Sequence, residues 1–471
     1  MKQSDVISIL KNLGYEVKTE YRSNFDKWLE AYKNNIQGFH EYTEYNGTKQ
    51  VSRKRLSLGL PKKACEDWAD TLFNDNTFIN VDVNDKEIVD KVLRKNNFRS
   101  QFNELIEKAY SLGTGSLVEF QDSKKSTVID FVTVLNIWPL KNYNGEISDV
   151  AFVSEYDSNT LYVNVHKRKE DGSYIIENRF FKKDKINEEV IIEGILTEVK
   201  SKVKLFQIIK PALANNIDLN QPLGMSIYAN AIHETKTADT AYTALNSEIH
   251  LGRMRVYLRG GAIAFNTVEF TDEKGKKDYR QVPIFDDEQE EFYLLPEDEE
   301  IAKNGKMIEV QTPELRVTSI IDSLQTNLNL FGRKVGLGDD YYSFKDGNVY
   351  TNTTSVISTN SKFYKTRMKH ATALENSIVE MVKAIMWLEK GVEYDKEISV
   401  DFDDSIVEDT QAVFNQSLLL LNANIISQAE FFRRTEKLTD EQAKNFVAQM
   451  NKEQGVMEED DPEDDELKEA K

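Results

Sequence analysis

Two stretches of the sequence decide the fold: SIYANAIHETKTADTAYTALNSEIHLGRMRVYLR at residues 226–259 and TPELRVTSIIDSLQTNLNLFGRKV at residues 312–335. In both, apolar or small residues recur at alternating spacings of three and four, which is typical of one face of a helix. The first stretch places Ala238, Tyr242, Leu245, Ile249, Gly252 and Val256 on that face, and the second places Val317, Ile320, Leu324, Leu328, Phe331 and Val335 there. The pattern predicts two long amphipathic helices, which would also suit the core of a large globular domain.

The segment between the helices, residues 260–311, is expected to form strands, turns and an acid-rich loop. Residues 286–300 hold nine carboxylates and neither lysine nor arginine. Such a run usually forms a solvated face, but its place between two long helices also favours an interaction surface. We leave both interpretations open.

The remaining sequence predicts a mixture of helices and strands, and therefore an α+β fold. Helices are expected over 23–45, 61–73 and 85–112, the last broken near Asn96, and a third long helix over 354–390. A strand is expected over 78–83, and residues 127–209 alternate with the period of antiparallel strands. Short helices are expected over 410–452, and the acidic tail at 456–471 is predicted to be disordered.

Composition excludes several classes of protein. The 471 residues carry a formal net charge of −20, which disfavours a general nucleic-acid binder because phosphate contacts drive such binding. The single cysteine, Cys65, excludes disulfide frameworks and cysteine-based zinc sites, and we expect folding in a reducing cytoplasm. No apolar run is long enough for a membrane span, and the N-terminus does not resemble a signal peptide.

No catalytic motif stands out. The glycine-rich segment at residues 332–338 does not follow a predicted strand, so it fails the test for a dinucleotide-binding turn. The five histidines do not pair at metal-ligand spacing. We therefore expect no catalytic residues, no metal and no cofactor, and an enzyme whose site lies hidden in the β-rich region stays an alternative.

Several strings, taken in order, resemble the portal proteins of tailed double-stranded DNA bacteriophages, of the type found in phages of Gram-positive hosts. They are KACEDWADTLFN at residues 63–74, GTGS at 113–116 and QPLGMSIY at 221–228, the last leading into a long helix with Ala238 and Asp239. The order helix, insert, helix, loop, helix strengthens the resemblance, which covers nearly the whole chain.

The resemblance implies a portal fold divided by element. Residues 1–221 would form a wing with an antiparallel β-rich region. Residues 222–259 and 312–336 would be the stem helices, with the clip between them at 260–311. Residues 337–353 would be the tunnel loop, 354–409 the wing helix and strand, 410–455 the crown and 456–471 the acidic tail.

The resemblance also assigns roles to particular residues. The tunnel loop would face DNA through Asp339, Asp340, Tyr341, Tyr342, Phe344, Lys345, Asp346 and Asn348. The clip would bind partners through Asp286, Asp287, Glu288, Glu290 and Glu291. Stem packing in the ring would use Tyr242, Leu245, Ile249, Val256, Leu324, Leu328 and Phe331. Lys345 would touch phosphate transiently, or would instead pair with Asp346 or a neighbouring subunit.

The implied function is a conduit at the capsid vertex through which DNA is packaged and ejected. The partners would be copies of the chain in a ring, usually a dodecamer, double-stranded DNA, the terminase, the head–tail adaptor, and the major capsid and scaffolding proteins, with no membrane. The protein would reside in the virion after assembly in the host cytoplasm. Another structural protein of the phage head or head–tail connector is the alternative.

Overall fold

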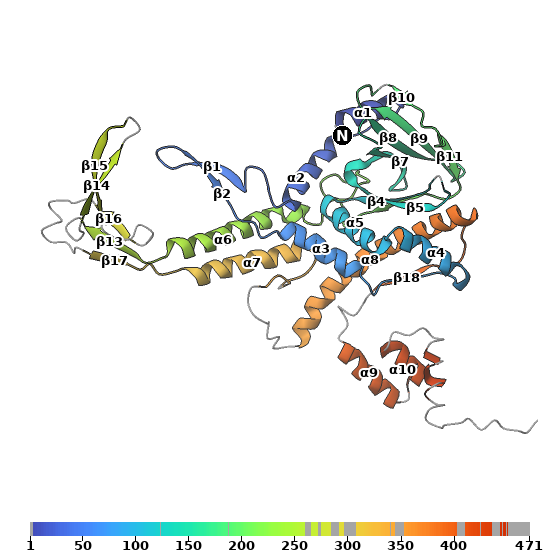
Figure 1. Cartoon of the computed structure of the whole chain (residues 1–471). Helices are drawn as coiled ribbons and strands as arrows, with labels where there is room; N and C mark the ends of the chain where they lie inside the picture. The colour runs from blue at the N-terminus through green and yellow to red at the C-terminus, as the bar shows by residue number, and fades with distance from the viewer. Residues whose placement is uncertain are drawn as a thin grey trace, which may run out of the picture. The chain divides into compact units, whose positions relative to one another are not determined.

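The chain combines helices with mostly antiparallel strands, so its fold class is α+β (Figure 1). The computed structural model describes residues 3–122, 124–186, 188–259, 265–271, 275–283, 292–295, 308–339, 341–343, 353–402, 410–423, 425–435, 443–444, 446–448 and 450. The chain divides into two compact units, one of Met1–Leu72 with Ile79–Val400 and one of Phe73–Phe78 with Asp401–Lys471. None of the described helices is long and apolar enough to cross a bilayer.

Eight α-helices are described in the first unit, and local signals explain several of their ends. The Asp82 side chain accepts a hydrogen bond from the Asn84 N–H and caps α4. Asn97 has a φ of 48° and separates α4 from α5. The helices are α1 (Gln3–Asn12), α2 (Ser23–Tyr32), α3 (Leu60–Leu72), α4 (Val83–Lys95), α5 (Phe98–Leu112), α6 (Ile232–Leu251), α7 (Val317–Val335) and α8 (Thr353–Lys390). The second unit contains α9 (Thr410–Asn422) and α10 (Gln428–Thr435).

The largest sheet is an antiparallel meander in the order β10-β9-β8-β7-β6, with β11 also pairing with β9. Asn144 and Gly145 both have positive φ at the turn between β6 and β7, as a two-residue hairpin loop requires. The strands are β6 (Ile137–Tyr143), β7 (Glu146–Glu155), β8 (Thr160–Arg168), β9 (Tyr174–Lys182), β10 (Glu189–Val190) and β11 (Glu198–Ser201). Helix α1 packs on this sheet, and together they bury a core that includes Leu10, Trp138 and Val163.

A second sheet, in the order β12-β4-β5, contacts both α5 and α8. Its strands are β4 (Gly115–Gln121), β5 (Thr127–Thr133) and β12 (Phe206–Ile209). The inward side chains of α8, among them Ile378, Met381 and Ile385, are fully buried. The Gln121 amide donates to the Leu388 carbonyl over 2.6 Å and joins the sheet to α8.

The segment between α6 and α7 contains strand pairs of its own. β13 (Arg255–Arg259) pairs in parallel with β16 (Phe292–Leu295) and antiparallel with β17 (Ile308–Gln311). β14 (Phe265–Thr271) and β15 (Lys277–Pro283) form a separate hairpin. Two further pairs are β1 (Glu41–Tyr45) with β2 (Gln50–Lys54), and β3 (Phe78–Asn80) with β18 (Ser399–Asp401).

The structure confirms the break between α4 and α5 and the long helix α8, whose start differs from the prediction by one residue. It corrects four other boundaries. The first long helix spans Ile232–Leu251, because Arg255–Arg259 pair as a strand with β17. The second begins at Val317 instead of 312. The helix expected over 23–45 ends at Tyr32, just before Asn34 with a φ of 56°, and its last part forms β1. The strand expected over 78–83 ends at Asn80.

Candidate functional site: the α6–α7 helical pair and its attachments

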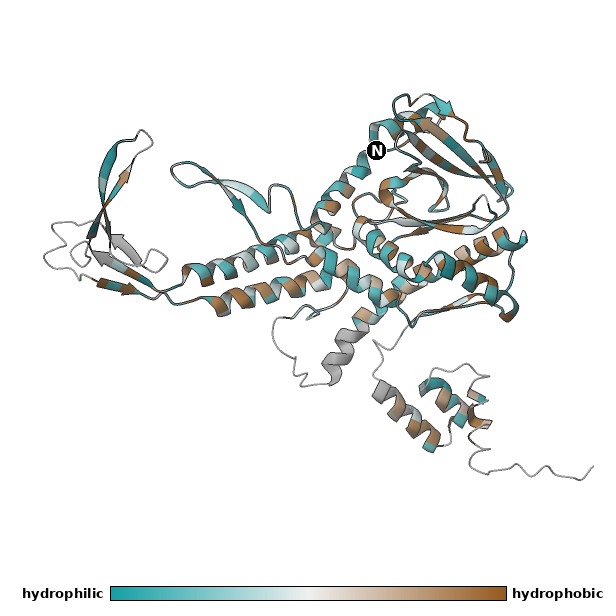
Figure 2. Cartoon of the chain, viewed as in Figure 1, coloured by the Kyte–Doolittle hydropathy of each residue, from teal (hydrophilic) through white to brown (hydrophobic). Residues whose placement is uncertain are grey.

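Helices α6 and α7 lie side by side, and hydrophobic residues occur along the length of α7 (Figures 1 and 2). The inward side chains Ala238, Leu324, Leu328 and Phe331 are buried within the single chain. A hydrogen bond of 2.9 Å from the Thr237 hydroxyl to the Asn327 side-chain oxygen crosses the pair. The two helices therefore behave as one packed element.

An ion pair joins the helices at each end. At the end nearer the insert, Arg316 donates from its guanidinium to both Glu248 oxygens over 3.1 and 2.8 Å, and its backbone N–H donates to the same carboxylate. These hydrogen bonds lower the pKa of Glu248 to about 2. At the opposite end, Lys334 lies 2.7 Å from a Glu234 oxygen and also donates to the Asn230 carbonyl. The pair is thus held in register at both ends.

The insert end of the pair is incompletely covered in the single chain. Ile249, Leu251 and Leu315 are 55%, 58% and 51% exposed. Small side chains, including Ala244 and Ser323, line a groove of about 460 Å³ between the helices there. Apolar side chains beside a groove form a surface that favours contact with another protein surface.

The end of α7 is fastened to α3. The Trp68 indole N–H donates to the Val335 carbonyl over 2.9 Å. Gly336 ends the helix with a φ of 85°, a left-handed conformation that favours glycine. Within α7, a Cβ on Gly332 would lie 2.5 Å from the Gly338 carbonyl oxygen, so the chain leaving the helix runs directly against it. The exit of the chain from α7 is therefore tightly fixed.

The described part of the predicted tunnel loop is attached to the same region. Arg333 donates to both Asp339 oxygens over 2.8 and 2.9 Å. The Tyr342 hydroxyl donates to Asp67 over 2.9 Å, and burial raises the Tyr342 pKa above its ordinary value. Tyr341 is 44% exposed, and burial of the rest of its side chain raises its pKa to about 12. Asp339 and Tyr342 thus anchor the root of the loop, while Asp340, Phe344, Lys345, Asp346 and Asn348 lie outside the described residues.

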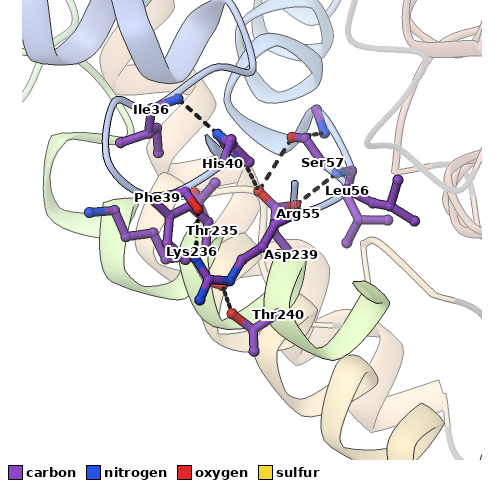
Figure 3. Close-up of polar contacts among 12 residues, drawn as sticks. Ile36, Phe39, His40, Arg55, Leu56, Ser57, Thr235, Lys236, Asp239 and Thr240 are labelled. Atoms are coloured by element: carbon purple, nitrogen blue, oxygen red, sulfur yellow. Dashed lines mark hydrogen bonds and ion pairs between the residues drawn. The ribbon is translucent and has the colours of Figure 1, made fainter. Parts of the chain in front are cut away.

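A buried carboxylate on α6, Asp239, fastens the segment that carries the β1–β2 hairpin (Figure 3). It accepts hydrogen bonds from the Leu58 backbone N–H over 2.7 Å, from His40 Nε2 over 3.0 Å and from the Ser57 hydroxyl over 3.3 Å. His40 Nδ1 accepts from the Ile36 N–H over 2.8 Å, which leaves the proton on Nε2. Burial raises the pKa of Asp239 despite these donors.

This cluster cannot be predicted from local sequence patterns, because its partners are up to 199 residues apart. The only local signal was a carboxylate, Asp239, next to Ala238 on the apolar face of the predicted helix. The cluster holds two segments together. Among its described members we find no arrangement of a nucleophile with a base.

The structure separates the predicted ring-contact residues into three groups. Leu324, Leu328 and Phe331 are buried inside the single chain, and their contact with a neighbour stays a prediction. Val256 is also buried, and it lies in strand β13 instead of a helix. Tyr242 and Leu245 are partly exposed and Ile249 is exposed, so their contact with a neighbour stays a prediction.

The predicted clip residues Asp286, Asp287, Glu288, Glu290 and Glu291 lie outside the described residues. Within the described ranges no three potential ligands gather to hold a metal ion.

One buried carboxyl group in the first unit has no hydrogen-bond partner. Both Glu119 oxygens are unpartnered within the described part of the chain, and burial raises the Glu119 pKa to about 8. The positive charge of Lys204 lowers the Glu119 pKa but does not offset the effect of burial. Glu119 lies on β4, away from the helical pair.

Comparisons with known proteins give one family match. The model of the family described as "Phage portal protein, SPP1 Gp6-like" matches residues 15–459. No curated protein matches the chain significantly. Among solved structures, a chain described as "Neck of native GTA particle computed with C12 symmetry" is 12% identical. It aligns over 79% of this chain and 89% of its own length, with a TM-score of 0.37.

Proposed function

The chain belongs to the SPP1 Gp6-like phage portal proteins, whose function lies at the capsid vertex, and we propose that its copies form a ring there through which DNA is packaged and ejected. The observation that carries this proposal is the match of the family model to residues 15–459. In the virion, the ring would lie where the head meets the tail.

The helical pair supports ring formation. Ile249, Leu251 and Leu315 remain exposed at the insert end of α6 and α7, although each is apolar. A neighbouring copy that covered them would remove this area from water, which is favourable by about 25 cal/mol per Å² of apolar surface. We propose that these residues contact the next subunit and that the ring is a dodecamer.

We propose that the segment between α6 and α7 binds the terminase during packaging and the head–tail adaptor afterwards. Support comes from its acidic composition over residues 286–300, which suits a partner with a basic surface. The major capsid and scaffolding proteins would contact the ring during assembly in the host cytoplasm.

The role is structural, without catalysis, in this proposal. The net charge of −20 suits a conduit, because an acidic wall repels phosphates and keeps the passage of DNA free of tight binding.

Imaging of the purified chain tests the proposal. Negative-stain views down the particle axis, with mass photometry in parallel, are expected to show rings of about a dozen copies. A stable monomer at micromolar concentration would contradict the proposal. Deletion of residues 341–348 should leave the rings intact and impair DNA packaging, and normal packaging by this variant would argue against the assigned tunnel loop.

A further inference from the structure

The first half of helix α8 differs in charge from the rest of the chain. Residues 347–374 contain no aspartate or glutamate, although the whole chain has 80 acidic and 60 basic residues. The same stretch contains Lys362, Lys365, Arg367 and Lys369. A local region of positive charge therefore stands in a strongly acidic protein.

One face of α8 is buried, and this determines which of its residues face solvent. Arg367, His370, Ala371 and Leu374 are buried on the inner face of α8. His370 Nδ1 accepts a hydrogen bond of 3.0 Å from the Ala212 N–H, which fixes the rotation of the helix about its axis. The opposite face is consequently turned to solvent.

Three lysines occupy that outer face, and we call them the lysine face. Lys362, Lys365 and Lys369 are all exposed, and their spacings of three and four align them along one side of the helix. Within the described residues, no hydrogen bond or ion pair engages their ammonium groups. Lys334 and Lys390, by contrast, each have a carboxylate beside them.

The lysine face begins close to the root of the loop that follows α7. The charge of Lys362 contributes to the lowered pKa of Asp339, so the two groups lie near one another. Asp339 is already held by both guanidinium contacts from Arg333. Asp339 is thus paired with Arg333 and not with Lys362 within the described residues.

We propose that the lysine face of α8 contacts the phosphates of double-stranded DNA, an inference that rests on the proposed function of the chain as a DNA conduit. At 1.5 Å per residue, Lys362 and Lys369 are about 10 Å apart along the helix. This is about three base-pair steps of a duplex, at about 3.4 Å each. In about 0.1 M salt, charges farther away than about 10 Å are largely screened, so the acidic remainder of the chain does not cancel this face.

The contact suits a duplex that must move. Lysine is a flexible point charge, and it recognises phosphate without the fixed bidentate geometry of arginine. Phosphate contacts carry no sequence information, so any stretch of DNA is bound equally. A weak, sequence-independent contact would guide the duplex past the helix without holding it.

The test is the salt dependence of binding between the full-length protein and a fluorescent 30-bp duplex. The triple variant Lys362→Gln, Lys365→Gln, Lys369→Gln removes the face. A control triple variant, Lys86→Gln, Lys91→Gln, Lys95→Gln, removes the same charge from exposed positions of α4. We expect the first variant to bind about tenfold or more weakly at low salt. Its plot of log affinity against log salt should flatten by roughly 0.9 for each phosphate that the lysines no longer neutralise.

Equal losses in the two variants, or no loss in either, would overturn the inference. Displacement of the duplex by polyglutamate at the same charge concentration would also overturn it, because the face would then serve an acidic protein segment. Ring formation by both variants is checked by mass photometry. If the unmodified chain forms rings and the affinities do not differ, the inference fails alone. If the unmodified chain forms no rings, the proposed function fails.

Discussion

The sheet β6–β11 and the α6–α7 pair are both regular and both amphipathic, but they reach different degrees of burial in one copy of the chain. The sheet, with α1 on one face, buries Trp138, Val163 and Leu10 almost completely. The pair buries Leu324 and Phe331 but leaves Ile249, Leu251 and Leu315 exposed at its insert end. The sheet thus has a core of its own within a single chain, and we propose that neighbouring copies cover the exposed end of the pair.

The largest expected effect comes from the core of the sheet. Replacing Trp138 by Ala should lower the free energy of unfolding by about 3–5 kcal/mol, because a large buried side chain is removed and the cavity is filled only partly. Denaturant unfolding followed by near-UV circular dichroism measures this. Leu196→Ala, at a position 71% exposed, is the control, and we expect a change within about 0.5 kcal/mol. An equal loss of unfolding free energy in the two variants would mean that the sheet does not form a stable core within a single chain.

The next largest effect is on the pH dependence of stability, and it comes from the unpartnered carboxyl group of Glu119. Its pKa is raised by burial from 4.5 to about 8, so the folded state holds a proton that the unfolded state releases. Its stabilising contribution is complete below about pH 4.5 and is lost as the pH rises towards 8, with a slope of at most about 1.4 kcal/mol per pH unit. Glu119→Gln should flatten the dependence of unfolding free energy on pH in this window. An unchanged slope would show that the carboxyl group is solvated or paired.

A smaller effect is expected where the helical pair meets α3. Gly336 has a φ of 85°, and a Cβ there would lie 2.9 Å from the Thr366 methyl group. Gly336→Ala should cost about 1–2 kcal/mol, since a left-handed conformation is unfavourable for any residue with a Cβ. Thermal unfolding measures the loss. Gly275→Ala, which also has positive φ but has open space around its Cβ, separates the cost of conformation from that of contact.

The smallest effect on the unfolding free energy of the single chain is expected at Ile249. This position also tests most directly whether the α6–α7 pair, unlike the sheet, contacts neighbouring copies. Ile249→Glu should change the unfolding free energy by no more than about 0.5 kcal/mol, because the side chain is already exposed. It should nevertheless weaken ring formation, since a charge would be buried against the neighbour. Sedimentation velocity measures both the monomer and the ring. Leu196→Glu in the sheet region should leave ring assembly unchanged. Loss of rings in this control would mean that the sheet region and the helical pair do not differ in their contribution to assembly.

Local signals explain which parts of the fold could be predicted from the sequence. The break at Asn97 and the end of α7 at Gly336 depend on neighbouring residues, and a sequence shows such signals directly. The end of α6 was missed because residues 255–259 satisfy the helical spacing, and pairing with a strand some 50 residues later overrides it. Strand pairing of this kind depends on long-range packing that periodicity does not reveal.

The candidate site was less predictable for the same reason. Leu324 and Ile249 occupy equivalent positions in their helical patterns, but only the structure distinguishes the one that is buried in the chain from the one that is exposed. The joint of His40 with Asp239 connects segments 199 residues apart. Local patterns therefore predicted the order of the elements, while the attachments between them required the three-dimensional structure.

The ladder between β13 and β17 has a consequence for engineering. Arg255 lies opposite Gln311 and Leu258 lies opposite Ile308, so the chain enters and leaves the insert at adjacent points, about 4.8 Å apart as neighbouring strands are. A segment whose two ends lie side by side in this way can be exchanged as a unit. Exchanging it between related chains, or replacing it with a short hairpin turn, would preserve the distance that α6 and α7 require. Helices α6 and α7 would then hold different inserts in the same position.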